Sequence, residues 1–481
     1  MVLGNLEPKV FFKNFEAISQ IPRGSGDEKR VSDFVTNFAR DLGYKVVQDT
    51  LNNVIIYKPA SAGYESKPAV ILQGHLDMVC EKNAGTEHDF TKNPLKLYID
   101  GGFVKAHGTT LGADNGTAVA ICMAILEDKA LQHPALEMVL TVEEETGMAG
   151  AENLEASLFK ATRMLNLDSS DEGVITIGCA AGVTVEYSIP LAFDAVPQDY
   201  SAFTIQVKGL HGGHSGADIH KGRGNALVMM GCVLGALEKD CGIRLAHIHG
   251  GMKLNAIPRE ATAEILVPAA HAEALKTAIA GCKRTFGEMY KATEPTLEIS
   301  CAAGTLPSRI FSAECSDKII ATLLLLPNGV QAMSQEMEGV VAASCNVGVV
   351  HTLKDAIKIE CFPRGATAFH LQGMEQQIRA LAGRTGAQAN FIQRSPAWAF
   401  DANSALLKEV VAVYEKQYGS APVVTALHAG LECGILAEKL PGLDIVSLGP
   451  NTHDLHTPDE RLSIASVGRV WAMIVALLGR L

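Results

Sequence analysis

Five short segments of the sequence place histidines or carboxylates directly after an apolar run, at the start of a helical stretch or in a loop. They contain, in chain order, His75 and Asp77, Asp114, Glu143 to Glu145, Asp168, and His456. Considered alone, Asp114 is best explained as a helix N-cap, and the glutamates as a solvated loop. Together the segments supply what a two-metal site needs, namely one bridging carboxylate and a histidine and a carboxylate for each ion.

The residue types in these segments restrict the metal and the chemistry. None of the five segments offers a cysteine at a ligand position, which favours zinc, manganese or cobalt bound by imidazole and carboxylate over a structural thiolate site. Three adjacent carboxylates repel one another unless a cation is near. Hydrolysis at such a site also needs a spare carboxylate, because a water molecule that attacks a substrate must pass its proton to a base.

The elements that must position these residues alternate between strands and helices. Short β-branched runs include YKVVQ, NVIIY, PAVILQG, EMVLTV and RMLNL, and a helical pattern covers residues 115–126. Such alternation predicts an α/β domain with a central mixed sheet flanked by helices, in which functional residues collect at the carboxyl ends of strands. The same alternation of strands and helices returns near the C-terminus, where a final helix is expected over 461–478. We therefore assign residues 1–181 and 396–481 to one catalytic domain.

The intervening residues, 182–395, have a different pattern of apolar and polar residues, which predicts an inserted α+β lid domain. Alternating runs such as VTVEYSIP and SAFTIQVKG indicate an antiparallel sheet with one solvated face. Helical patterns follow in two pairs, over 224–238 and 271–290 and then over 317–326 and 366–382. This arrangement predicts a doubled module of a sheet and two helices.

Composition and charge exclude several classes of protein. The chain of 481 residues has 41 Lys and Arg against 53 Asp and Glu, a formal net charge of −12, which disfavours nucleic acid or an anionic membrane as a partner. Its 11 cysteines form no C-x-x-C pair and predict no disulfide framework. No signal peptide and no apolar run of about 20 residues is evident, so we expect a cytoplasmic protein.

Several motifs resemble the signature segments of a known family. GHLDMV, TLGADNGTAVA, VEEETGMAGA, LNLDSS, GLHGGHSG and HTPDE are similar to those of the co-catalytic zinc peptidases, which include aminoacylase, carboxypeptidase G and carnosinase. LPNGV, MEGVVAASCNVGVV and HAGLECGIL resemble a subgroup of that family, the aminoacyl-histidine (Xaa-His) dipeptidases. The resemblance covers essentially the whole chain.

The resemblance implies a role for each matching residue. Asp114 would bridge two zinc ions, with His75 and Asp168 on one ion and Glu145 and His456 on the other. Asp77 would orient His75, and Glu144 would be the general base and acid. In the lid, His214 and Asn255 would bind the substrate at its carbonyl oxygen and Arg364 would bind its C-terminal carboxylate. Gly430, in the catalytic domain, would line the opposite wall through its backbone.

The implied activity is metal-dependent hydrolysis of small dipeptides, preferentially Xaa-His. A water molecule bridging two zinc ions per subunit, with manganese or cobalt as substitutes, would attack the scissile carbonyl while Glu144 takes its proton. An N-acyl amino acid deacylase with the same metals remains an alternative, and a catalytically inactive zinc-dependent binding protein is an alternative of another class. The resemblance also implies a homodimer in which His214 serves the partner's metal site, although a doubled lid would let one chain close its own.

Overall fold

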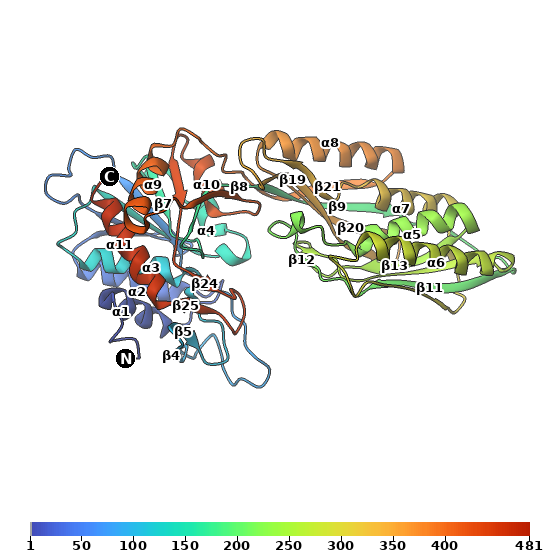
Figure 1. Ribbon diagram of the computed structural model, residues 1–481, viewed down its shortest axis with the longest axis horizontal. Coiled ribbons are helices and arrows are strands. Elements are labelled where there is room, and N and C mark those ends of the chain that lie inside the picture. The colour runs from blue at the N-terminus through green and yellow to red at the C-terminus, as the bar shows by residue number, and fades with distance from the viewer. Residues whose placement is uncertain (1) are drawn as a thin grey trace. The chain divides into compact units, whose positions relative to one another are not determined.

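The computed structural model describes residues 2–481 as two compact units, each with a sheet of its own (Figure 1). The first unit runs up to Gly178 and is completed by Phe400–Ala426 and Leu431–Leu481. The second unit consists of Cys179–Ala399 and Leu427–Gly430. The four residues Leu427–Gly430, which the sequence placed in the catalytic domain, therefore pack with the second unit.

The first unit is built on an eight-stranded mixed sheet in the order β1-β2-β6-β3-β7-β23-β8-β22. Its central strands β6, β3, β7 and β23 run parallel to one another, and β1, β2 and β8 are antiparallel to their neighbours. The strands are β1 (Lys45–Gln48), β2 (Val54–Lys58), β3 (Val70–His75), β6 (Leu136–Thr141), β7 (Arg163–Asn166), β8 (Val174–Cys179), β22 (Val423–Leu427) and β23 (Asp444–Ser447). A small second sheet has the order β24-β25-β5-β4, with β4 (Leu97–Asp100), β5 (Phe103–Ala106), β24 (Thr452–His453) and β25 (Arg461–Ser463).

Helices flank the main sheet of this unit (Figure 1). They are α1 (Lys9–Ser19), α2 (Lys29–Asp41), α3 (Ala113–Glu127), α4 (Ala149–Asn153), α9 (Ala405–Tyr418), α10 (Glu432–Lys439) and α11 (Ile464–Leu478). The last helix starts three residues later than the sequence predicted, because Arg461–Ser463 pair with β5 as strand β25.

The centre of the first unit is apolar on every side, as a parallel strand covered on both faces requires. All residues of β3 and β6 are buried, and so is every residue of α3 from Asn115 to Leu126. Gly74 lets α3 approach β3 closely, since a Cβ there would lie 2.3 Å from the Cβ of Ala118 and from Oδ1 of Asn115. The next residue is His75, so this contact fixes the end of the strand that carries the first candidate ligand.

The second unit is built on an antiparallel sheet in the order β16-β11-β15-β13-β19-β20-β9-β21, with β18 paired to β19. The strands are β9 (Ala181–Pro190), β11 (Tyr200–Lys208), β13 (Arg244–Gly250), β15 (Ala261–Pro268), β16 (Glu298–Ala303), β18 (Gly329–Met333), β19 (Val341–Thr352), β20 (Ala356–Gly365) and β21 (Gln388–Ser395). Short pairs are formed by β10 (Phe193–Asp194) with β17 (Ile310–Phe311) and by β12 (Gly213–His214) with β14 (Ala256–Ile257). The helices are α5 (Ala226–Cys241), α6 (Ala272–Met289), α7 (Ala313–Leu325) and α8 (Ala368–Thr385).

This sheet consists of two similar halves. From its edge to its middle, the first half has the order β16-β11-β15-β13 and the second the order β21-β9-β20-β19, and β13 pairs with β19 at the joint. Helices α5 and α6 pack on the first half, α8 packs on the second, and α7 lies between α5 and α8. Each half is thus a four-stranded sheet with two helices.

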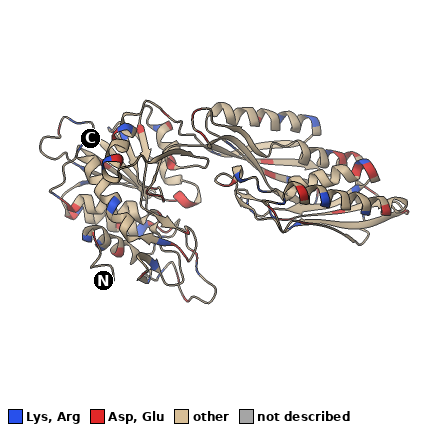
Figure 2. Cartoon of the chain, viewed as in Figure 1, with Lys and Arg blue, Asp and Glu red and all other residues tan. Residues whose placement is uncertain are grey.

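The structure confirms the predicted fold class, an α/β domain with a central mixed sheet and an inserted α+β domain. Positions of Lys and Arg are interspersed with positions of Asp and Glu along the helices of both units (Figure 2). Among residues 2–481, none of the helices is both long enough and apolar enough to span a bilayer.

Candidate active site

The first candidate ligand, His75, stands at the end of β3 and is held at two points. It is buried, and its backbone N–H donates to Oδ1 of Asn115 at 3.1 Å. Its Nδ1 lies 3.2 Å from Oδ1 of Asp77, so the other ring nitrogen, Nε2, points away from Asp77. This is the arrangement in which one ring nitrogen is oriented by a carboxylate and the other is left for a ligand.

Asp114 is not a helix N-cap, contrary to the explanation that suits the residue alone. Gly112 occupies the cap position of α3, and the backbone of Asp114 is not helical. Its carboxylate instead faces two histidines. Oδ1 lies 3.0 Å from Nε2 of His75, and Oδ2 lies 3.3 Å from Nε2 of His456. Each oxygen thus faces a different imidazole, as a bridging carboxylate must.

Asp168 and Glu145 complete two groups of donors that share Asp114. Oδ1 of Asp168 lies 3.5 Å from Nε2 of His75, and Oε1 of Glu145 lies 3.1 Å from Nε2 of His456. The ligand atoms of His75, Asp114 and Asp168 all lie within 4.8 Å of one another, and so do those of Asp114, Glu145 and His456. The structure therefore brings together all five sequence-predicted ligands, in the two sets that the resemblance implies.

Glu144 lies in a short 3₁₀ turn beside these groups. The turn covers Glu144–Thr146, and the backbone N–H groups of Glu144 and Glu145 donate to the two oxygens of Asp77, each at 3.2 Å. Asp77 therefore positions the turn as well as His75. Oε2 of Glu144 lies 4.0 Å from Nε2 of His75, so its carboxylate faces the donor groups.

The crowding of carboxylates and imidazoles shifts their pKa values. Burial raises the pKa of Asp168 to about 7, and the neighbouring Asp114 carboxylate adds to that effect. Burial likewise raises the pKa of Glu144 well above its ordinary value. A hydrogen bond to Asp114, together with the nearby carboxylate of Glu145, raises the pKa of His456 to about 10. Without a cation these groups retain protons that a metal ion would displace.

Three supporting residues were not predicted from the sequence. Glu460 accepts hydrogen bonds from the backbone N–H groups of residues 111–114, at 2.7 to 3.3 Å. Arg23 is buried and donates to the carbonyls of Leu76, Asp77 and Gly112. Ser25 donates to Oδ2 of Asp77 at 2.8 Å. Glu460 belongs to the HTPDE motif, and Arg23 and Ser25 lie in the Gly- and Ser-containing stretch IPRGSG between α1 and α2.

In the second unit, the predicted substrate residues His214 and Asn255 lie on neighbouring segments. His214 pairs with Ala256 across β12 and β14, and the backbone N–H of Ser215 donates to the carbonyl of Asn255 at 2.8 Å. Nδ1 of His214 accepts hydrogen bonds from the backbone N–H groups of Gly216 and Ala217. The proton of the neutral imidazole is therefore on Nε2, which is left as a donor. Burial, together with the cation of Arg364, lowers the pKa of His214.

The predicted substrate residue Arg364 lies in the same cluster. A Cβ at Gly216 would come within 3.2 Å of both Nε of Arg364 and Cε1 of His214, and within 2.1 Å of the carbonyl of His428. Arg364 is 4 % exposed, and within residues 2–481 no carboxylate lies within 4.0 Å of its guanidinium. Burial lowers the pKa of Arg364 to about 10. A buried cation without a counter-charge is a site for an anion.

Two buried residues around Gly430 were not predicted. Gly430 itself lies in the four-residue segment Leu427–Gly430 of the second unit, with His428 two residues before it. Nε2 of His428 lies 2.7 Å from Oγ of Ser344, and burial with the nearby Arg364 lowers the pKa of His428 to about 3. Glu432, in the first unit, is also buried. Both residues belong to the HAGLECG motif, of which only the glycine received a role.

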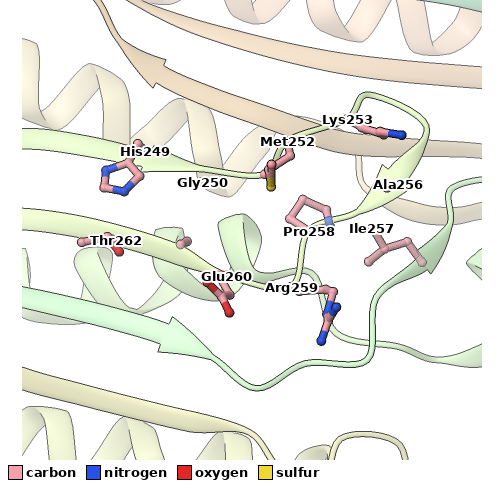
Figure 3. A pocket seen from close by; sticks show the side chains of 12 residues that line it. His249, Gly250, Met252, Lys253, Ala256, Ile257, Pro258, Arg259, Glu260 and Thr262 are labelled. Carbon is pink, nitrogen blue, oxygen red and sulfur yellow. The ribbon is translucent and has the colours of Figure 1, made fainter. Parts of the chain in front are cut away.

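The second unit also contains a cavity of about 510 Å³, at the loop between β13 and β15 (Figure 3). It is lined by His249–Lys253 and Ala256–Thr262. His214, Asn255, Arg364 and Gly430 are not among its lining residues, but the lining residue Ala256 follows Asn255 and pairs with His214.

Comparisons with known proteins identify the family of the chain. The model of peptidase family M20/M25/M40 matches residues 71–480. The chain is 37% identical over 476 residues to the cytosol non-specific dipeptidase of Escherichia coli (strain K12), a match that covers 99% of this chain and 98% of that protein.

Solved structures give the same result. The aminoacylhistidine dipeptidase from Vibrio alginolyticus superposes with a TM-score of 0.92 at 37% identity, over 100% of this chain and 98% of the other. Human carnosine dipeptidase 1 shares the fold, with a TM-score of 0.51 at 12% identity over 98% and 95% of the two chains. The family that the motifs predicted is confirmed: the chain belongs to peptidase family M20/M25/M40.

Proposed function

We propose that the chain is a metal-dependent dipeptidase whose site holds two metal ions between His75, Asp114, Glu145, Asp168 and His456. The observation that carries this proposal is the position of Asp114, whose two carboxylate oxygens face the imidazoles of His75 and His456. One ion would lie with His75 and Asp168, the other with Glu145 and His456, and Asp114 would bind both. Zinc is the metal that we propose, because its usual ligands are imidazole and carboxylate, and manganese or cobalt would be substitutes.

The donors fit this metal pair without rearrangement of the chain. Oε1 of Glu145 is buried and has no hydrogen-bond partner within residues 2–481, although Nε2 of His456 lies 3.1 Å away. The two atoms are close but poorly aligned for a hydrogen bond, as expected for two donors that point to a common ion. A metal ion would also offset the negative charge of four clustered carboxylates, those of Asp114, Glu144, Glu145 and Asp168.

The two metal ions, when bound, would polarise the scissile carbonyl and make a water molecule more acidic. Glu144 is the general base that takes the proton of the attacking water and later gives it to the leaving amine. Its raised pKa suits this role, and it belongs to neither of these two donor sets, although it forms a third group of possible ligands with His75 and Glu145. Asp77 orients His75 through Nδ1 and fixes the backbone of Glu144.

Substrate recognition falls to the second unit. The unpaired guanidinium of Arg364 would bind the C-terminal carboxylate of a dipeptide, which makes a free C-terminus a requirement. The Nε2–H group of His214, with Asn255, would donate to the carbonyl oxygen that becomes negative during attack. Gly430 would border the substrate through its backbone. These assignments rest on the unpaired cation and on the histidine tautomer.

We infer a preference for Xaa-His dipeptides, with other dipeptides as slower substrates. The Vibrio alginolyticus relative is named for aminoacylhistidine and the Escherichia coli relative for non-specific dipeptides, at the same 37% identity. We also propose that the protein works in the cytoplasm. The predicted homodimer, in which His214 serves the partner's site, stays a prediction, and the doubled lid is the argument for a chain that closes its own site.

One panel of substrates tests the proposal. The zinc-loaded enzyme should hydrolyse Xaa-His dipeptides fastest, other dipeptides more slowly, and C-terminally amidated dipeptides hardly at all. Faster cleavage of N-acyl amino acids than of dipeptides would instead make the protein a deacylase. Zinc binding without hydrolysis of either class would make it a binding protein.

The homodimer has its own experiment. Co-refolding His214→Ala with Glu144→Ala chains should restore about a quarter of wild-type activity if His214 acts across a two-fold interface. No recovery despite proven subunit exchange would exclude donation between subunits.

A further inference from the structure

A row of buried polar side chains crosses four neighbouring strands beneath the metal-binding donors. Thr141, Gln73, Asn166 and Ser447 lie on β6, β3, β7 and β23, which are adjacent in that order. All four are at most 1% exposed. In a sheet whose centre is otherwise apolar, such groups are costly to bury unless each of them is hydrogen-bonded.

The hydrogen bonds in this row all lead to Glu432. Oγ of Ser447 donates to Oδ1 of Asn166, and Nδ2 of Asn166 donates to Oε1 of Gln73, each at 2.5 Å. Nε2 of Gln73 donates in turn to Oε2 of Glu432, also at 2.5 Å. The same oxygen of Glu432 accepts a hydrogen bond from Oγ1 of Thr141 at 2.6 Å.

Glu432 is the residue that fixes this direction. Asn and Gln side chains carry both a donor and an acceptor, so a row of them can run either way. A carboxylate oxygen that receives two hydrogen bonds is an acceptor for both, and it obliges Gln73 to present its N–H group to Glu432 and its oxygen to Asn166. Glu432 is 1% exposed, and its other oxygen, Oε1, is buried without a hydrogen-bond partner within residues 2–481.

Two residues of this row, Gln73 and Asn166, each lie two positions before a candidate metal ligand. His75 follows Gln73 by two residues, and Asp168 follows Asn166 by two residues. Side chains two residues apart on an extended chain project from the same face. Gln73 and Asn166 are direct partners in the register of β3 and β7. The hydrogen bond between their side chains therefore sets the spacing of the two chain ends that carry His75 and Asp168.

We propose that Glu432 is a positioning residue for His75 and Asp168, acting through the direction and spacing of the row Gln73–Asn166–Ser447. This inference rests on the proposed metal site. Glu432 is outside both donor sets and would not touch substrate. Its removal should disturb the metal pair through the strand ends, whereas a buried glutamate elsewhere would affect only stability.

Glu432→Gln tests this proposal with little change of shape. The amide has only one acceptor oxygen, so either its N–H group faces Gln73 and that hydrogen bond is lost or reversed, or its N–H group is buried at the position of Oε1, which has no hydrogen-bond partner within residues 2–481. We expect about tenfold weaker zinc binding at one of the two sites, measured by competition with a chelator, and about a tenfold lower kcat, since supporting residues of metal ligands have effects of about this size.

Glu137→Gln is the matched control. Glu137 is a buried glutamate of β6 that accepts hydrogen bonds from the backbone N–H groups of Lys160 and Ala161, away from the row. Its variant should lose stability but keep both zinc affinities and kcat within about twofold of wild type. If Glu432→Gln binds zinc and turns over dipeptide like Glu137→Gln, Glu432 is not a positioning residue.

The double variant Glu432→Gln with Gln73→Glu decides the matter even if the single variant fails to fold. It exchanges the carboxylate and the amide, so the nitrogen at position 432 can donate to position 73 and to Oγ1 of Thr141, whose hydroxyl can donate to the carbonyl of Gly74, while position 73 accepts from Asn166. Zinc affinity should return to within about threefold of wild type. If the double variant folds but binds zinc about tenfold more weakly than wild type, as expected for Glu432→Gln alone, the proposal is contradicted. Wild-type protein that neither binds two zinc ions nor cleaves dipeptides would refute the proposed function instead.

Discussion

Glu460 accepts a hydrogen bond from the backbone N–H of Asp114, the last of four consecutive N–H groups that its carboxylate receives. Glu460 follows His456 by four residues, so the loop that carries one candidate ligand is fixed to the loop that carries the bridging carboxylate. Two segments almost 350 residues apart in sequence are therefore held in one geometry before any metal binds.

Asp114→Ala should lower the metal content below two ions per chain. Removing the shared carboxylate leaves both cations with less negative charge around them, so each binds more weakly. Elemental analysis of the purified variant after dialysis measures this directly. Asp171→Ala, which changes an exposed aspartate close to Asp168, is the control and should keep its metal. Full occupancy in Asp114→Ala would exclude the bridge.

Glu144→Ala should keep both metal ions and lose turnover. A general base and acid is worth about 100-fold or more in rate, and Glu144 is not needed to complete either donor set. Metal content and kcat are measured on the same preparation, with the exposed Glu152→Ala as the control for a lost charge. If the metal leaves together with the activity, Glu144 is a ligand and its assignment as base is wrong.

Arg364→Met should remove the preference for a free C-terminus. The buried guanidinium lies over the ring of Phe362 and donates to Oγ of Ser215 at 3.5 Å, and within residues 2–481 it forms no ion pair with a carboxylate, so a substrate carboxylate would be its counter-charge. Charged hydrogen bonds of this kind are worth about 1.5 to 3 kcal/mol, which corresponds to a 10- to 100-fold loss in kcat/KM. The ratio of kcat/KM for a dipeptide and its amide is the readout, and Arg379→Met, on the exposed side of α8, is the control. An unchanged ratio would place Arg364 outside the site.

His428 should make the protein less stable in acid. Its pKa is about 3 in the folded chain and about 6.5 in the unfolded one, because burial and Arg364 oppose the charged form. The unfolded state therefore binds more protons between these values, and the free energy of unfolding falls as the pH falls, by up to about 1.4 kcal/mol per pH unit. His428→Gln should lack this contribution. The shift of its denaturation curve between pH 7.5 and pH 4.5 should therefore be smaller than the same shift in wild type. If the shift in His428→Gln equals the shift in wild type and in the exposed control His351→Gln, the predicted contribution of His428 is refuted.

The position at a strand end pointed to two of the candidate ligands, and the resemblance of the motifs implied the full set of five. His75 ends β3 and Asp168 follows β7, which are neighbours in the sheet, and residues at the ends of parallel strands gather at one edge. The polar residues that hold the ligands obey no such rule. Glu432 meets Gln73 across 359 positions of sequence, and nothing in a Gly-rich segment indicates that its glutamate is buried.

Local patterns also misled where a distant contact decides the structure. Asp114 before a helical stretch has the features of an N-cap, but the N–H groups there are taken by Glu460. Glu460 in turn appeared to open the final helix, whereas the chain first forms the three-residue strand β25 against β5. Tertiary hydrogen bonds override local preference at both places.

Titration of metal-free protein with zinc, while hydrolysis of an Xaa-His dipeptide is followed, tests the central claim most directly. Activity should be absent at the start, appear as zinc is added, and reach its plateau at two ions per chain. Full activity in the metal-free protein, or a plateau with one ion or none bound, would contradict a site in which Asp114 joins two metal ions.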